Sequence, residues 1–115
     1  MFDKALLIAK TEAELGALAL VVILATSSNR EKRKDPWQAA EIGYLTALMS
    51  HEKKSADPKF DNIRALLMQD AAVVEPVLKE VWSSHDEAFR KSIVNSLSMR
   101  VIELCEYQDR FLGVR

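Results

Sequence analysis

The sequence contains few of the residues that shape β-rich or disulfide-stabilised proteins. Of its 115 residues, three are glycine, three are proline and one is cysteine. So few glycines and prolines leave little turn chemistry for an all-β fold, and they favour helices. Because a single cysteine cannot form an intramolecular disulfide, we expect a reducing compartment and a cytoplasmic location.

The chain also lacks an excess of either charge. It carries 16 basic and 17 acidic residues, a formal net charge of −1. A dedicated nucleic-acid-binding protein normally has a clear basic excess, so this balance argues against that class. With 49% apolar and 29% charged residues the composition is that of a globular protein. The length suits one core without metal or disulfide support, and we expect a single helical domain over residues 1–115.

The longest apolar run covers residues 15–25 and is too short to cross a membrane. A transmembrane helix needs about 20 apolar residues, and this run is preceded by Glu12 and Glu14. A signal peptide would begin with basic residues, whereas residues 1–14 have a net charge of −1. We therefore expect a buried helix and no membrane segment.

One long helix is expected over residues 4–27, with Asp3 as its N-cap. Ala, Leu, Glu and Lys dominate this segment, and it contains no proline. Its second half is apolar on every side, as in helices at the centre of a bundle or between two subunits. The residues predicted to form a dimer interface are Ala13, Gly16, Leu20, Ile23 and Leu24.

Two Asp-Pro pairs, at 35–36 and 57–58, predict the next helix starts, because Asp caps and Pro suits the first turn. The second helix is expected to run to about residues 51–54 and the third to about residue 69. A fourth is expected over 71–83, although Pro76 lies in its second turn. The side chains expected to face inward are Trp37, Ala40, Tyr44, Leu45 and Leu48 in the second helix, and Phe60, Ile63, Leu66 and Leu67 in the third.

The last helix is expected over residues 85–112, with Ser84 in a capping box with Glu87 and an end at Gly113. Apolar residues three and four positions apart form a coiled-coil-like seam along it. The seam consists of Val94, Leu97, Val101, Leu104, Gln108 and Phe111. The predicted architecture is therefore an all-α bundle of about five helices with a long first and a long last helix.

No combination of residues predicts catalytic or metal chemistry. His51 and Glu52 begin like the zinc-binding pattern H-E-x-x-H, but the second histidine is missing. Ser84 and His85 are neighbours at a helix start, so their side chains point apart, and capping explains the serine. Cys105 suits a buried position as a small hydrophobic residue. We expect a protein that is not an enzyme and has no metal or cofactor; a small enzyme with an unrecognised pocket is the second alternative.

The sequence contains one basic cluster despite its balanced overall charge. The cluster offers candidate phosphate contacts at Arg30, Lys32, Arg33 and Lys34. The first alternative function is therefore a nucleic-acid-associated regulator. Four cations in a connection between helices would bind phosphate weakly and without specificity. We favour a solvated connection and expect no nucleic-acid partner.

The two long helices carry more apolar surface than a small five-helix monomer covers, and surplus apolar surface usually indicates a partner. We expect a helical protein–protein interaction module, a homodimer that acts as a small regulator, adaptor or sequestering protein of the anti-activator type, the last by analogy alone. A foreign protein partner is expected at the end of the last helix, because aromatic and Arg residues dominate binding hot spots. The residues predicted to bind it are Tyr107, Arg110, Phe111, Leu112 and Val114. The alternative is that Phe111 and Leu112 close the core.

Overall fold

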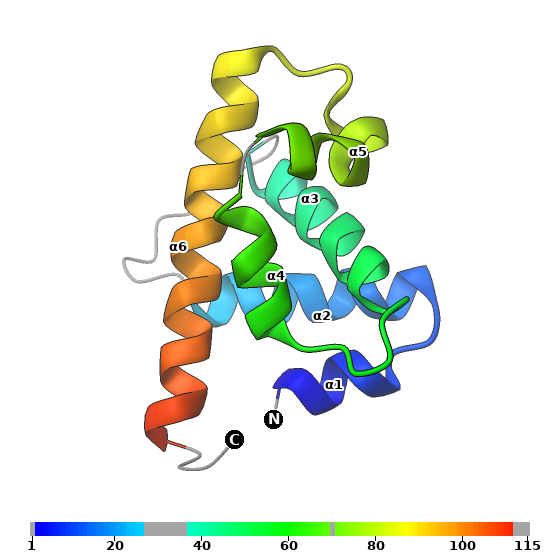
Figure 1. Ribbon diagram of the computed structural model, residues 1–115, viewed down its shortest axis with the longest axis vertical. Helices are drawn as coiled ribbons and strands as arrows, with labels where there is room; N and C mark the ends of the chain where they lie inside the picture. Colours follow the sequence, from blue (N-terminus) through cyan, green and yellow to red (C-terminus); the bar gives the residue numbers. More distant parts are fainter. Residues whose placement is uncertain (1, 27–36, 70, 112–115) are drawn as a thin grey trace.

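The computed structural model describes residues 2–26, 37–69 and 71–111, with the side chains of 71–73 and 109–111 left aside. These residues form six α-helices and no strand, so the all-α prediction is confirmed (Figure 1). The predicted number of five is wrong, because the expected first helix is divided in two. The helices are α1 (Phe2–Ile8), α2 (Glu12–Ala25), α3 (Trp37–Glu52), α4 (Phe60–Leu67), α5 (Ala71–Trp82) and α6 (Glu87–Phe111).

A capping box separates α1 from α2. The hydroxyl of Thr11 accepts a hydrogen bond of 3.1 Å from the backbone N–H of Glu14. In return, Oε1 of Glu14 accepts from the backbone N–H groups of Lys10 and Thr11, at 2.6 and 3.1 Å. These bonds lower the pKa of Glu14, the bond from Lys10 most strongly. The two residues satisfy the free amides of a new helix start, and the single helix expected over 4–27 is corrected accordingly.

The central helix is α3, which packs against α2, α4, α5 and α6 (Figure 1). The radius of gyration of 13.4 Å is that of a compact fold of this length, about 13 Å. Most of the predicted inward residues are confirmed as buried core. They are Ala40, Tyr44, Leu45, Leu48, Phe60, Ile63, Leu67, Leu97, Val101 and Leu104.

The short helix α1 connects two distant parts of the chain. Oε1 of Gln108 in α6 accepts hydrogen bonds from the backbone N–H groups of Phe2 and Asp3, at 3.1 and 3.4 Å. Oδ1 of Asp3 accepts from the backbone N–H of Phe60 at 2.8 Å, at the start of α4. The prediction that Asp3 caps its own helix is therefore wrong: Asp3 caps α4, and Gln108 caps α1.

The start of α6 also differs from the prediction. Oδ1 of Asp86 accepts a hydrogen bond of 2.8 Å from the backbone N–H of Phe89, so Asp86 caps the helix in place of Ser84. The helix begins at Glu87 and its described part ends at Phe111. The expected fourth helix agrees closely with α5, which contains Pro76 in its second turn.

A buried ion pair joins α3 to α6. Glu41 is 1% exposed, and its carboxylate accepts two hydrogen bonds from Arg100: Nε to Oε2 at 2.9 Å and Nη2 to Oε1 at 3.2 Å. The hydroxyl of Ser96 donates to the same carboxylate. Nη1 of Arg100 donates to the carbonyl oxygen of Ile23 at 2.9 Å and to the hydroxyl of Thr26 at 3.3 Å. Arg100 therefore fixes the C-terminal end of α2 against α3 and α6.

Candidate functional site

One side of α2 exposes apolar side chains. Leu20, Val21 and Leu24 are 38%, 51% and 57% exposed, and the alanines at 13 and 17 are exposed on the same side. The opposite side of the helix is buried in the core. No charged residue lies between Glu14 and the end of the helix, so water contacts an uninterrupted apolar surface. We call this surface the α2 stripe; it consists of Ala13, Ala17, Leu20, Val21 and Leu24.

Three of the five residues predicted for a dimer interface lie on the α2 stripe, namely Ala13, Leu20 and Leu24. Gly16 is partly exposed beside them. Ile23 is the exception, because it is 2% exposed and packs in the core of its own chain. The prediction is corrected at this position. Because the helix is apolar on every side, the spacing of its apolar residues did not show which side packs in the core.

A groove of about 800 Å³ adjoins the α2 stripe, and we call it the α3 groove. Four small residues of α3 line it, three and four positions apart, so that they share one side of the helix: Gly43, Thr46, Ala47 and Ser50. On either side, α2 contributes Glu12 and Ala13, and α5 contributes Pro76, Val77 and Val81. Since Ala13 belongs to both, the stripe and the groove form one continuous surface.

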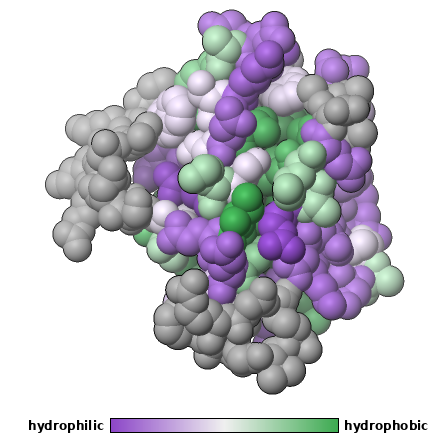
Figure 2. Space-filling view, turned by 60° about the vertical axis from the view of Figure 1, so that its left-hand side comes forward, coloured by the Kyte–Doolittle hydropathy of each residue, from purple (hydrophilic) through white to green (hydrophobic). Residues whose placement is uncertain are grey.

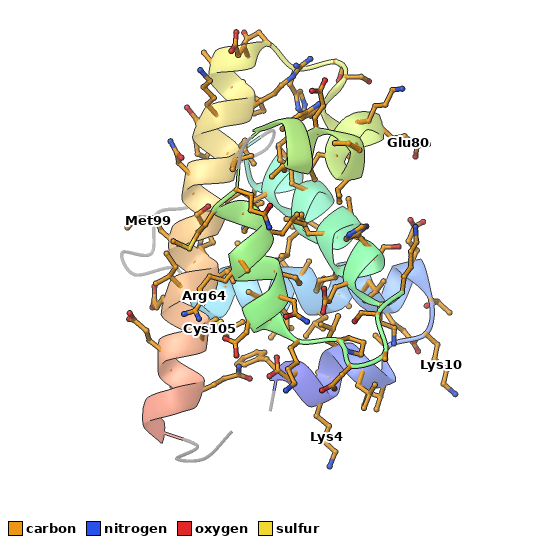
Figure 3. All side chains as sticks on the ribbon, viewed as in Figure 1. Lys4, Lys10, Arg64, Glu80, Met99 and Cys105 are labelled. Carbon is orange, nitrogen blue, oxygen red and sulfur yellow. The ribbon has the colours of Figure 1, made fainter. Side chains whose placement is uncertain are left out.

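Charged side chains of both signs line the α3 groove. Glu12 comes from α2, Lys54 follows α3, and Lys79 and Glu80 come from α5. In Figure 3, Glu80 projects outward from α5, on the same side of the molecule as Lys10 in the α1–α2 turn. Within the described part of the chain, none of the four lining residues forms an ion pair. Two acids and two lysines give the groove no preference for a partner of one charge.

The side of the molecule near α6 also presents some apolar surface. Figure 2 brings this side forward and shows hydrophobic atoms in a small central area bordered by hydrophilic side chains. Met68 after α4 and Met99 on α6 are exposed, and Figure 3 places Met99 on the outside of α6. Isolated exposed methionines are ordinary on a protein surface and define no site.

The predicted partner-binding and phosphate-binding residues are only partly described. Tyr107 is 43% exposed, whereas the side chains of Arg110 and Phe111, and all of Leu112 and Val114, lie outside the described residues. The basic cluster of Arg30, Lys32, Arg33 and Lys34 also lies outside them. The neighbour of Tyr107, Gln108, is buried against α1, so the α6 turn that holds Tyr107 is in contact with the bundle.

The two histidines lie apart and have different surroundings. His51 is exposed and lines the α3 groove, while the adjacent Glu52 turns inward and accepts hydrogen bonds from Lys59 N–H at 3.1 Å and Asn62 Nδ2 at 2.5 Å. His85 Nδ1 lies 2.6 Å from the hydroxyl of Tyr44. Burial raises the pKa of Tyr44, an effect that the positive charge of Arg90 opposes. The residues that the structure describes contain no group of three or more His, Cys, Asp or Glu side chains placed to hold a metal ion.

Sequence reasoning missed the α3 groove because three helices from separate parts of the chain form it. One local signal was present: small residues recur at 43, 46, 47 and 50 on one side of a helix whose other side is large and apolar. Spacing of this kind marks a helix side that another backbone can approach closely. This spacing does not show that α2 and α5 flank that side of α3 and complete the groove.

Comparison of the chain with protein families, with curated proteins and with solved structures finds no match. Among the described helices, none is long and apolar enough to cross a bilayer. The apolar helix α2 has 14 residues, whereas a span needs about 20. The α2 stripe and the α3 groove are the features of the described structure that bear on function.

Proposed function

We propose that this protein is a non-enzymatic helical protein–protein interaction module that forms a homodimer through the α2 stripe. The observation that carries the proposal is the exposure of Leu20, Val21 and Leu24 on a helix side without charged residues. Contiguous exposed apolar surface of this kind marks interaction sites on soluble proteins. A small dimer of this type suits a regulator, adaptor or sequestering protein of the anti-activator class.

The α2 stripe supplies a large part of the binding energy that a dimer needs. Covering a side chain that is about half exposed contributes about 1 kcal/mol, so a symmetric pair gains about 6 kcal/mol from its leucines and valines. A micromolar Kd corresponds to about 8 kcal/mol, before the cost of ordering side chains is met. The stripe alone falls short of this value, and a stable dimer must cover further surface.

The test of this proposal is the molar mass in solution. Light scattering coupled to gel filtration is expected to give twice the monomer mass of 13.0 kDa at micromolar concentration. Leu24→Lys places a charge in the interface and is expected to raise the dimer Kd by about a hundredfold or more. The control is Met68→Lys, which changes an exposed apolar residue after α4 and is expected to leave the mass unchanged. A mass of 13.0 kDa at every concentration would refute the homodimer.

A foreign protein partner is proposed to dock at the end of α6. Tyr107 supports this, because an exposed tyrosine on a helix turn that Gln108 holds to α1 provides the aromatic anchor typical of binding hot spots. Truncation after Gln108, combined with Tyr107→Ala, removes the whole predicted partner-binding set and keeps the hydrogen bonds of Gln108 to α1. Loss of a captured partner with an unchanged melting curve is the expected result. A large loss of stability would instead assign these residues to the core, and full stability with full binding would refute both interpretations.

A further inference from the structure

Two glycines near the α2 stripe and the α3 groove have open space where a side chain would stand. A Cβ atom added at Gly16 or Gly43 would meet no other atom within 4 Å, so neither position is needed for packing inside the monomer. Neither glycine has the positive φ that would exclude other residues. Glycine within a helix lowers stability relative to alanine. A second backbone that approaches from outside the chain would account for both positions.

The α2 stripe and the α3 groove are of comparable length. From Ala13 to Leu24 the stripe extends about 17 Å at 1.5 Å per residue. On α3, the groove lining extends from Gly43 to His51, which is about 12 Å, and Lys54 continues it beyond the end of the helix. The groove has small residues at its base and the stripe has large ones at its outer side, as ridges-into-grooves packing of helices requires.

We propose that the α3 groove of one copy receives the α2 stripe of a second copy, and that its own stripe enters the second copy's groove. This inference rests on the proposed homodimer and names the second surface that such a dimer covers. Since the stripe and the groove share Ala13, a two-fold axis near this residue places both contacts in one interface. An isologous interface has this property: each copy contributes the same two surfaces.

The charges around the α3 groove favour a second copy over a strongly charged partner. Glu12, Lys54, Lys79 and Glu80 have no ion-pair partner within the described residues. With two acids and two lysines at its border, the groove has no net charge from these residues, so it does not repel an identical copy and does not attract a strongly charged partner. The net charge of −1 per chain adds almost no repulsion between copies.

The first test fills the groove without disturbing the stripe. Gly43→Leu introduces a large side chain into open space on α3, where leucine is also a better helix former than glycine. The melting temperature is expected to stay the same or rise, while the dimer Kd increases at least tenfold. The matched control is Ala88→Leu, which places the same side chain at an exposed position of α6 and is expected to leave the Kd unchanged.

The second test measures proximity and does not depend on how well the filled groove folds. Protein carrying G43C is mixed with protein carrying L20C under mild oxidation, and disulfide-linked heterodimers are measured on non-reducing gels. The native Cys105 is buried, so wild-type protein serves as the background. A heterodimer is expected for this pair, whereas G43C mixed with M68C is expected to give only the background level.

The outcomes separate this inference from the proposed homodimer. Loss of dimer in both Leu24→Lys and Gly43→Leu, together with the G43C–L20C cross-link, would support both. If Leu24→Lys becomes monomeric while Gly43→Leu dimerises like the wild type and no cross-link forms, the groove inference is overturned and the homodimer stands. A wild-type monomer at millimolar concentration would overturn both and leave the groove to a helix of another protein.

Discussion

Arg100→Met is expected to be among the most destabilising single substitutions in this protein. It removes both charge-assisted hydrogen bonds to the carboxylate of Glu41, which is 1% exposed. In the variant, this carboxylate keeps only the hydroxyl of Ser96 as a donor. Breaking a buried ion pair from one side costs about 3–5 kcal/mol. A chain of this length has a total stability of about 6–17 kcal/mol at 0.05–0.15 kcal/mol per residue. The substitution therefore removes a large share of the stability.

Urea unfolding followed by far-ultraviolet circular dichroism measures this loss, with thermal melting as a second readout. At about 4 °C per kcal/mol, the melting temperature is expected to fall by about 12–20 °C. The control is Lys91→Met on the same helix, because the ion pair of Lys91 with Glu87 is exposed and contributes at most about 0.5 kcal/mol.

A double-mutant cycle distinguishes a lost ion pair from lost packing. Glu41→Met combined with Arg100→Met replaces both charges by apolar groups of similar length, and this exchange is often neutral for buried pairs. The double variant is expected to be more stable than Arg100→Met alone by about 2 kcal/mol or more. A cost below about 1 kcal/mol for Arg100→Met, or costs that simply add in the double variant, would refute the role assigned to this pair.

Three further outcomes follow from hydrogen bonds and burial within the fold. Thr11→Ala removes the cap of α2 and is expected to cost about 1 kcal/mol in urea unfolding, whereas Thr11→Ser retains it. Gln108→Leu leaves the first amides of α1 without their acceptor, so amide exchange in α1 is expected to accelerate with little change in α3. Because burial raises the pKa of Tyr44 above 10.0, the stability due to Tyr44 is complete below that pH and is lost as the pH rises beyond it. Tyr44→Phe is therefore expected to reduce the decline of melting temperature above pH 10, and an equal decline in this variant would contradict the assignment.

Local patterns predicted most of the helices, because helix caps and amphipathic spacing depend on residues that are close together in the sequence. The helices over 37–52 and 71–82 agree closely with expectation. The break between α1 and α2 had a local signal too, since Thr11 and Glu14 have the spacing of a capping box. Strong helix formers on both sides concealed it, as propensity summed over the whole segment favoured one long helix.

Tertiary contacts were beyond sequence reasoning. Glu41 and Arg100 lie 59 residues apart, and each resembles an ordinary surface charge in its own helix. The same holds for Asp3, which resembles the cap of its own helix but caps α4. For the candidate site, the sequence predicted that α2 is apolar. It did not predict which side of α2 is buried, because all sides of this helix are apolar. Ile23 was misplaced for this reason.

The pairing of Gln108 with α1 has a consequence for the time at which the chain can complete its structure during synthesis. The acceptor for the Phe2 amide lies 106 positions further along the sequence, and at 5–20 residues per second a ribosome needs about 5–20 s to add them. Until then α1 lacks its cap, and a helix of seven residues is unstable by itself. Until α1 is folded, Asp3 is not held in the position from which it caps α4. The residues of α1 are therefore fixed only after α6 has been made, although they are translated about 100 positions earlier.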